Sequence, residues 1–411
     1  MDHATAMDIL SGRRRGWMAS AVRAALAPAG VAYGLAMRVR RRAYAGGLCP
    51  ARKADVPVIS VGNLTTGGTG KTPMVAWIVT RLAALGHRPA VVMRGYRSRD
   101  GRSDEAQLLE SLCNAAPRST GVPPVSRMGV SPMQGQPVGQ IFMSQPNATE
   151  TPVPCVEHGR DARETHGQDA RATWPVPVIV DPDRVAGARA ACELGADCVV
   201  LDDAFQHVRI RRDVDIVLID ATNPLGFGRC LPRGLLREPP SALRAADAIV
   251  LTRADAVGPA ELDAIEATLR RHAGDCAPIF RAAHRPTAVI DESGVRHAVE
   301  SLAGREVFAF CGIGNAGAFF RTLESLHARL TGRRELGDHA HYDATRLTEL
   351  AVAARAAGAD RWITTQKDFV KLQGMTLPLP CWQLAVEMEL LDGGERLFEL
   401  VAGAVARETS Q

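Results

Sequence analysis

The sequence lacks the paired cysteine spacings that are typical of disulfide-rich proteins and metal sites. Its nine cysteines include no C-x-x-C spacing and follow no secretory signal, and they stand at positions 49, 113, 155, 192, 198, 230, 276, 311 and 381. This scatter argues against a secreted scaffold held together by disulfides. We therefore expect buried or incidental thiols in a reducing compartment.

The chain also has little net charge, and its basic character belongs to one end. The formal charge is +4, yet residues 1–55 hold ten Lys/Arg and three Asp, a formal +7, which leaves the other 356 residues at −3. A basic arm could bind nucleic acid, but nothing downstream supports that partner. With 46% hydrophobic residues, the chain has material for a core and for two domains.

The N-terminal segment lacks an uninterrupted hydrophobic run. Trp17–Met37 is about long enough to cross a bilayer, but it is rich in alanine, contains Pro28 and has arginines at both ends, so it encodes no orientation. The pattern favours an amphipathic helix lying in the interface of an anionic membrane. We expect acyl-chain contacts from Trp17, Leu26, Tyr33 and Leu35, and headgroup contacts from the flanking arginines, including Arg38, Arg40, Arg41 and Arg42. A spanning helix and a soluble helix with a solvated basic face are the alternatives.

What the chain does have is a glycine-rich stretch between a strand and a helix. The β-branched run Val58–Val61 predicts a buried parallel strand, and an apolar-periodic helix is expected over Lys71–Leu85. A strand, a glycine loop and Gly70-Lys71-Thr72 together make the P-loop arrangement. The alternative is a glycine turn that happens to precede a lysine.

The P-loop interpretation predicts a nucleoside triphosphate site. Glycines let backbone N–H groups converge on phosphate oxygens at a helix N-terminus. Lys71 would reach the β- and γ-phosphates, and the Thr72 hydroxyl would take a place on Mg²⁺. The pattern opens on Thr65 instead of glycine, while two glycines follow shortly after. The ATP-binding residues we expect are Thr65, Thr66, Gly67, Gly68, Thr69, Gly70, Lys71 and Thr72.

Acidic residues follow two further predicted strands. Asp104 and Glu105 lie in the polar loop after the strand Ala90–Met93, and Asp202-Asp203 directly follows the strand Cys198–Leu201. Loops at the carboxyl ends of parallel strands form the site in α/β sheets. The second pair has the Walker B form, in which a carboxylate holds Mg²⁺. Taken alone, the first pair could simply be solvated.

The middle of the chain lacks any sustained hydrophobic period. Ten of the 25 prolines fall between residues 117 and 177, and an eight-residue tandem repeat covers 158–173. We expect 113–175 to be a disordered insertion. Its two histidines, at 158 and 166, are not assigned to a metal.

The C-terminal third predicts a second lobe. Two short strands around Glu292-Ser-Gly294 indicate a hairpin. A G-x-G-x-x-G run at 312–317 has the form of a dinucleotide fingerprint, but no acidic residue closes a strand about 20 residues further on. A tight turn under a helix explains it. The expected divisions are a basic membrane-associating segment (1–54), a P-loop domain (55–286), a hairpin linker (287–304) and a C-terminal α/β lobe (305–411).

These motifs resemble the tetraacyldisaccharide 4′-kinase family, the lipid A 4′-kinases. The resemblance covers the whole P-loop run at 61–73, Ser-Asp-Glu at 103–105, Asp-Asp-Ala-Phe-Gln-His at 202–207, Leu-Arg-Glu-Pro at 236–239, Asp-His-Ala-His-Tyr at 338–342 and Thr-Gln-Lys-Asp-Phe-Val-Lys-Leu at 365–372. It implies an α/β fold with a P-loop NTPase-like doubly wound parallel sheet, a smaller α/β lobe and the N-terminal helix. The 113–175 insertion lies outside the family pattern.

The resemblance also implies an activity. Such kinases transfer the γ-phosphoryl group of ATP to the 4′-hydroxyl of an acylated glucosamine disaccharide 1-phosphate, at the cytoplasmic face of the bacterial inner membrane. It implies Asp104 as the catalytic carboxylate and His339 as its partner; Ala340 departs from the pattern and leaves His341 as the alternative. It implies that Asp202, Asp203 and Glu238 are associated with Mg²⁺, beside Thr72.

Two rival functions stay open on the sequence. The first is a P-loop GTPase or metallochaperone, since Thr252-Arg-Ala-Asp255 distantly resembles a guanine-reading motif with arginine in place of lysine. The second is an ATP-gated membrane adaptor without catalysis, which would need neither Asp104 nor His339.

Overall fold

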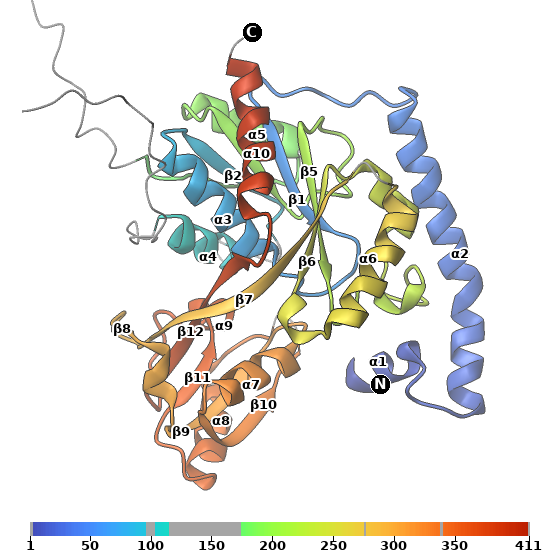
Figure 1. Cartoon of the computed structure of the whole chain (residues 1–411). Helices are drawn as coiled ribbons and strands as arrows, with labels where there is room; N and C mark the ends of the chain where they lie inside the picture. The colour runs from blue at the N-terminus through green and yellow to red at the C-terminus, as the bar shows by residue number, and fades with distance from the viewer. Residues whose placement is uncertain (1–2, 96–102, 115–173, 275–276, 338–339, 410–411) are drawn as a thin grey trace, which may run out of the picture. The chain divides into compact units, whose positions relative to one another are not determined.

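A computed structural model of the chain describes residues 3–95, 103–114, 174–274, 277–337 and 340–409. Its strands form one 12-stranded sheet in the order β10-β9-β11-β12-β7-β6-β5-β1-β4-β2-β3, with β8 paired to β7 (Figure 1). The strands are β1 (Val58–Asn63), β2 (Pro89–Met93), β3 (Val178–Val180), β4 (Cys198–Asp202), β5 (Val214–Asp220), β6 (Ala248–Thr252), β7 (Ile279–Ile290), β8 (Arg296–His297), β9 (Glu306–Cys311), β10 (Arg329–Glu335), β11 (Trp362–Thr365) and β12 (Cys381–Leu390). The expected disorder of 113–175 falls almost wholly outside the described residues.

Helices connect these strands. They are α1 (His3–Ser11), α2 (Trp17–Ala45), α3 (Lys71–Ala84), α4 (Asp104–Cys113), α5 (Arg184–Glu193), α6 (Pro259–Ala273), α7 (Ala316–Ser325), α8 (Ala344–Ala356), α9 (Gln366–Val370) and α10 (Gly394–Thr409), with short 3₁₀ turns η1 (Gly226–Gly228), η2 (Pro240–Ala245), η3 (Ala254–Ala256) and η4 (Val299–Leu302). The first half of the sheet consists of neighbouring strands in the order β7-β6-β5-β1-β4-β2-β3, and every pair of neighbours in it is parallel. The predicted doubly wound parallel sheet is therefore confirmed.

The sheet topology explains where a site can form. β1 lies between β4 and β5, and Val61 on β1 is in register with Asp202 at the end of β4. All six residues of β1 are buried, as the β-branched run predicted. The carboxyl ends of β1 and β4 therefore lie side by side, and this edge carries both the glycine loop and the acidic pair.

The smaller α/β lobe is present, but it is joined to the first half more closely than a hairpin linker suggests. Strands β9, β10, β11 and β12 are parallel to one another. The long strand β7 pairs in parallel with β6 and antiparallel with β12, where Ala282 lies opposite Leu390 and Ile290 opposite Gln383. β7 also turns into β8 at the predicted hairpin. One continuous strand thus serves both halves of the sheet.

The last helix does not belong to the lobe that precedes it. Leu397, Val401 and Val405 of α10 are buried in the same hydrophobic cluster as Ile78 and Leu82 of α3. Phe398 meets Trp77 edge to face, with ring centroids 6.0 Å apart. The prediction that 305–411 forms a single lobe is therefore wrong for α10, whose apolar face completes the core of the first half.

Helix α2 continues through Pro28 for 29 residues and packs against the 230–239 segment through two glycines. A Cβ on Gly30 or Gly34 would lie only 3.0–3.1 Å from Arg233 or Cys230. Tyr33 is half-buried, and burial followed by the nearby Cys230 and Glu238 raises its pKa. Tyr33 is therefore partly covered by the protein, and its contact with lipid stays a prediction. Among the described residues, no helix combines the length and the apolar character needed to cross a membrane.

Candidate active site

The glycine loop after β1 adopts a backbone that other residues would resist. Gly70, just before α3, has a left-handed φ of 89°, and Gly67 has a φ of 120°. A Cβ on Gly70 would lie 2.2 Å from Nε2 of His284. Gly70 therefore needs both the positive φ and the missing side chain. The first turn of α3 then begins at Lys71, as the P-loop pattern predicted.

The loop is fastened to the segment that carries Glu238. The backbone N–H of Thr66 donates to Leu235 O at 2.8 Å, and that of Arg237 donates to Leu64 O at 2.7 Å. Within the loop, Asn63 Nδ2 donates to Thr69 Oγ1 at 3.1 Å. Two stretches about 170 residues apart in the sequence are thereby held together by main-chain hydrogen bonds.

Asp203 is held between two cations. Lys71 Nζ lies 3.6 Å from its Oδ1, and Arg237 Nη1 donates to Oδ1 and Oδ2 at 2.8 and 2.9 Å. Burial pushes the pKa of Asp203 upward, but Lys71 and Arg237 outweigh it, and the pKa falls below its usual range. Asp203 also has a φ of 52°, which is uncommon for any residue but glycine. A strained, doubly paired carboxylate beside a P-loop lysine is typical of a functional site.

The neighbouring carboxylate is deeply buried. Asp202 is 5% exposed, and its Oδ1 has no hydrogen-bond partner. Burial raises its pKa to about 7, against the lowering effect of Lys71 and with a further rise from Asp203 and Glu105. Glu238 is 1% exposed and pairs through Oε2 with Arg41 at 2.7 Å, while its Oε1 is buried without a partner. A buried carboxylate oxygen without a hydrogen-bond partner is typical of a position where a cation or a water molecule binds.

The predicted magnesium residues are not gathered into a preformed cluster. In the described part of the chain, no three His, Cys, Asp or Glu side chains are grouped so that they could hold a metal ion. The structure brings Lys71, Asp202 and Asp203 together at one edge, with Thr72 next in the first turn of α3. Mg²⁺ usually takes only one or two protein carboxylates and completes its shell with phosphate and water, so this arrangement is compatible with it.

Asp104 is the first residue of α4, after the part of the loop that lies outside the described residues. Its neighbour Glu105 forms an ion pair with Lys367 of α9, at 3.2 Å, and is close enough to Asp202 to raise its pKa. The start of α4 therefore lies near the acidic end of β4. His339 falls outside the described residues, and the alternative, His341, is exposed.

The glycine run of the second lobe reaches the P-loop. A Cβ on Gly314 would lie 3.2 Å from the nitrogen of Gly68. The run is held by Asp368, a fully buried carboxylate that accepts from Gly312 N and from Thr365 Oγ1, each at 2.8 Å. The sequence interpretation of this run as a tight turn missed its contact with Gly68, because the residues within the run do not indicate which distant segment it approaches.

Two arginines and one lysine with clear contacts were also missed as site residues. Arg237 and Lys367 lay inside quoted motifs but without a role. Arg253 ion-pairs with Asp220 and donates through Nη2 to Gly68 O at 2.8 Å. No local signal could have found these contacts, because Arg237 pairs with Asp203 and Lys367 with Glu105, each in another motif.

This fold and edge define a P-loop nucleotide-binding protein. A family model described as tetraacyldisaccharide-1-P 4′-kinase matches residues 22–113 and 168–405. The chain belongs to the tetraacyldisaccharide-1-phosphate 4′-kinase family.

Curated relatives cover nearly the whole chain. A tetraacyldisaccharide 4′-kinase of Syntrophotalea carbinolica is 38% identical over 374 residues, spanning 90% of this chain and 89% of the relative. One of Geobacter metallireducens is 37% identical over 375 residues, spanning 90% and 95%. Among solved structures, the LpxK of Aquifex aeolicus, determined in complex with ATP, shares the fold with a TM-score of 0.61 at 23% identity, covering 93% of this chain and 99% of that one.

Proposed function

We propose that this protein transfers the γ-phosphoryl group of ATP to the 4′-hydroxyl of a tetraacyldisaccharide 1-phosphate, as the names of its relatives state for them. The observation that carries the proposal is the contact of Lys71 with Asp203 at the carboxyl edge shared by β1 and β4. Phosphoryl transfer needs a positioned cation at the β- and γ-phosphates and little covalent chemistry from the protein.

The phosphates would lie in the loop formed by residues 65–72. Backbone N–H groups of the glycines and the N-terminus of α3 face the chain of phosphate oxygens in such loops. Lys71 is then able to exchange its contact with Asp203 for one with the β- and γ-phosphates. Gly314 would approach the same loop from the second lobe.

Mg²⁺ is compatible with this edge because the buried Asp202 Oδ1 has no partner, and Glu238 Oε1, on the segment tied to the P-loop by main-chain hydrogen bonds, is also buried without one. We propose Thr72, Asp202, Asp203 and Glu238 as the residues that hold it directly or through water. When bound, the ion would neutralise phosphate charge. Lys71 and Arg237 together lower the pKa of Asp203, which favours its ionised form for this role.

Asp104 is the proposed acceptor of the 4′-hydroxyl proton, with His339 as its partner. Asp104 begins α4, and the Glu105–Lys367 pair ties this helix to the second lobe. A carboxylate is a weak base for an alcohol, but the proton can leave late in a loose transition state.

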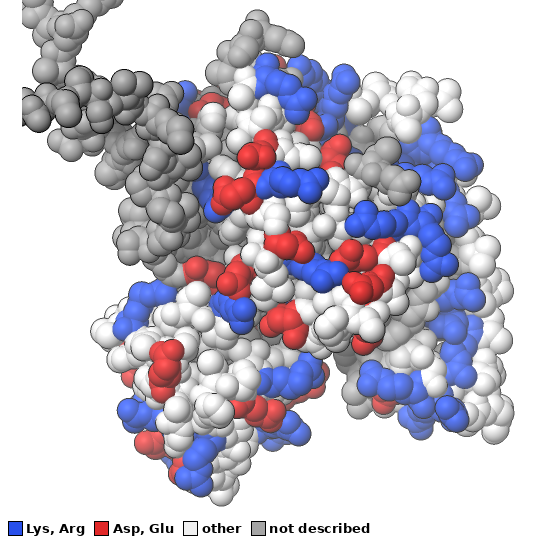
Figure 2. All heavy atoms as spheres, viewed as in Figure 1, with Lys and Arg blue, Asp and Glu red and all other residues white. Residues whose placement is uncertain are grey.

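An acylated substrate resides in a membrane, so the protein needs a surface that binds the membrane. Helix α2 has one exposed apolar face. Val31, Leu35 and Val39 are 72, 58 and 58% exposed and follow one another at four-residue steps, with Trp17 at 80% five turns before Leu35. Leu26 is half-buried and lies on the other side of the helix, so it is not part of this exposed face. Lys and Arg gather along the α2 side of the molecule (Figure 2). We propose that this face lies on the cytoplasmic leaflet of the bacterial inner membrane.

One assay tests the proposal. The purified protein is incubated with γ-radiolabelled ATP and the tetraacyl disaccharide 1-phosphate in detergent micelles, and label in the lipid is measured. We expect transfer that depends on the lipid and on Mg²⁺. GTP in place of ATP tests the GTPase alternative. Hydrolysis without lipid labelling, or thermal protection by GTP alone, would contradict the proposal.

A further inference from the structure

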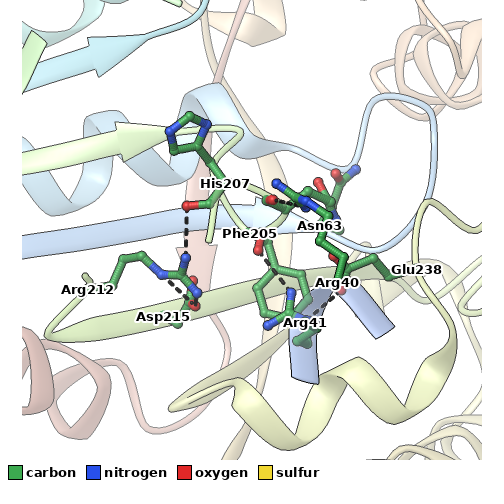
Figure 3. A network of polar contacts seen from close by, with 9 residues as sticks. Arg40, Arg41, Asn63, Phe205, His207, Arg212, Asp215 and Glu238 are labelled. Atoms are coloured by element: carbon green, nitrogen blue, oxygen red, sulfur yellow. Dashed lines mark hydrogen bonds and ion pairs between the residues drawn. The ribbon is translucent and has the colours of Figure 1, made fainter. Parts of the chain in front are cut away.

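Two of the four arginines at the end of α2 turn toward the protein, whereas the sequence placed all four on lipid headgroups. Arg41 donates through Nε to Glu238 Oε2 at 2.7 Å and through Nη2 to Phe205 O at 3.0 Å, and its guanidinium lies 4.3 Å from the centre of the Phe205 ring. Arg40 Nη1 donates to Gln206 O at 2.8 Å. Figure 3 shows Arg40 and Arg41 reaching this loop from the end of α2.

The loop that they hold is part of the nucleotide site. Gln206 Nε2 donates to Asn63 O at 2.7 Å, and Asn63 in turn binds Thr69 in the P-loop. Phe205 packs so closely on β1 that a Cβ on Gly62 would lie 2.5 Å from the Phe205 Cβ. The backbone at 205 and 206 therefore connects α2 with the P-loop through a short, rigid series of contacts.

Glu238 is reached by α2 as well. Its backbone neighbour Arg237 is fastened to Leu64, so the main chain fixes the residue beside the P-loop. Its carboxylate is buried, and Arg41 is the ion-pair partner of its Oε2. A buried carboxylate that loses its ion-pair partner is strongly destabilised. Arg41 therefore determines which way the free Oε1 points.

We infer that Arg41, supported by Arg40, is a positioning residue of the magnesium–nucleotide site, so that the lipid-facing helix is also a structural part of that site. The inference rests on the proposed kinase function, because it assumes that Glu238 serves Mg²⁺. Arg41 would act through Glu238 and the 205–206 backbone. Removing residues 1–45 would then weaken ATP binding as well as membrane binding.

The test is Mg²⁺-dependent nucleotide binding without lipid. Binding of a fluorescent ATP analogue is titrated with Mg²⁺, and again in EDTA, for the full chain, Arg41→Gln, Arg41→Lys and Arg40→Gln. Partners that orient metal ligands typically change metal affinity by about 10- to 100-fold when lost. We expect Arg41→Gln to raise the Mg²⁺ concentration for half-maximal binding by about tenfold or more, with little change in EDTA. Arg41→Lys should recover part of the loss, because it keeps the charge but not the three contacts.

Arg42→Gln is the matched control. Arg42 is exposed on the same helical turn, so its replacement should leave nucleotide binding in solution at the wild-type level. The inference is overturned if folded Arg41→Gln binds Mg²⁺ and the analogue like wild type, or if Arg41→Lys and Arg41→Gln lose binding equally in EDTA and in Mg²⁺. If Arg41→Gln shows the expected loss of Mg²⁺-dependent binding but the wild-type protein never labels the lipid, the proposed acceptor fails while the inference stands.

Discussion

Nζ of Lys367 lies 3.2 Å from Oε1 of Glu105, and this ion pair joins α9 in the second half of the sheet to α4 in the first. Glu105 directly follows Asp104, the proposed proton acceptor. α9 also holds Asp368, which fastens the glycine run that approaches the P-loop. A single short helix therefore touches both the acceptor side and the phosphate side of the proposed site.

The first prediction concerns this pair. Lys367→Met should lower turnover by about tenfold or more, because small displacements of a catalytic group are costly. The melting temperature should change little, since a pair of this exposure contributes about 1 kcal/mol or less. The control is Arg329→Gln, which breaks an exposed pair with Glu306 in the same lobe. Equal losses of turnover in the two variants would show that Lys367 contributes no more to catalysis than an exposed surface residue.

Lys71→Ala should reduce phosphoryl transfer about 10²- to 10³-fold, because a preorganised charge at the phosphates is lost in the transition state. The measurement is initial-rate transfer to the micellar lipid acceptor, together with thermal protection by ATP. Arg81→Gln, toward the other end of α3, removes an ion pair with Glu395 and should keep transfer. Near wild-type transfer by Lys71→Ala would remove the P-loop from the mechanism.

Stability should depend on pH through His284. Burial, followed by the charge of Arg253, lowers the pKa of His284 to about 3, below the usual value of about 6.5. Since the folded pKa is the lower one, the contribution of neutral His284 is complete above pH 6.5 or so and is lost as pH falls toward 3. Urea unfolding from pH 8 to pH 5 should therefore show a steeper loss for wild type than for His284→Gln. Parallel pH profiles would contradict this.

Removal of residues 117–171 should leave the melting temperature and transfer nearly unchanged. The ends of this segment are already tied, because Val176 N donates to Asn114 Oδ1 at 2.8 Å and Asn114 Nδ2 donates to Val176 O at 3.2 Å. Loop length itself costs little closure entropy. A longer deletion that includes Trp174 should be less stable, since Trp174 Nε1 donates to Pro89 O at 3.0 Å. Loss of folding with the shorter deletion would mean that the segment packs on the core.

The apolar face of α2 should bind vesicles. Replacing Val31, Leu35 and Val39 by Ser removes three exposed apolar side chains and should weaken sedimentation with anionic vesicles several-fold, as apolar burial contributes about 25 cal/mol per Å². Val352→Ser, an equally exposed apolar residue of α8, is the control. If both proteins sediment like wild type, α2 does not insert.

Local pattern was sufficient for the elements of the P-loop half. The buried run before the glycines is β1, the helix begins at Lys71, and the acidic pair stands at the carboxyl end of β4, with Asp202 as its last residue. Each depends on interactions within a few residues: strand propensity, positive φ at glycine, and an N-terminal helical turn. Parallel pairing then brings the ends of β1 and β4 together without further information.

Contacts between distant segments could not be obtained in this way. The antiparallel pairing of β7 with β12 and the return of α10 to α3 depend on which apolar faces remain uncovered once the rest has folded. Periodicity marks the faces of a helix but does not say which one is covered.

Helix α2 shows the division most clearly. The sequence determined a helix with an apolar stripe and four arginines at its end. The docking of Gly30 and Gly34 against the 230–239 segment decided its rotation, because only there can the backbones approach so closely. That rotation turned Arg40 and Arg41 toward the acidic loop and Glu238, while Arg38 and Arg42 stayed exposed.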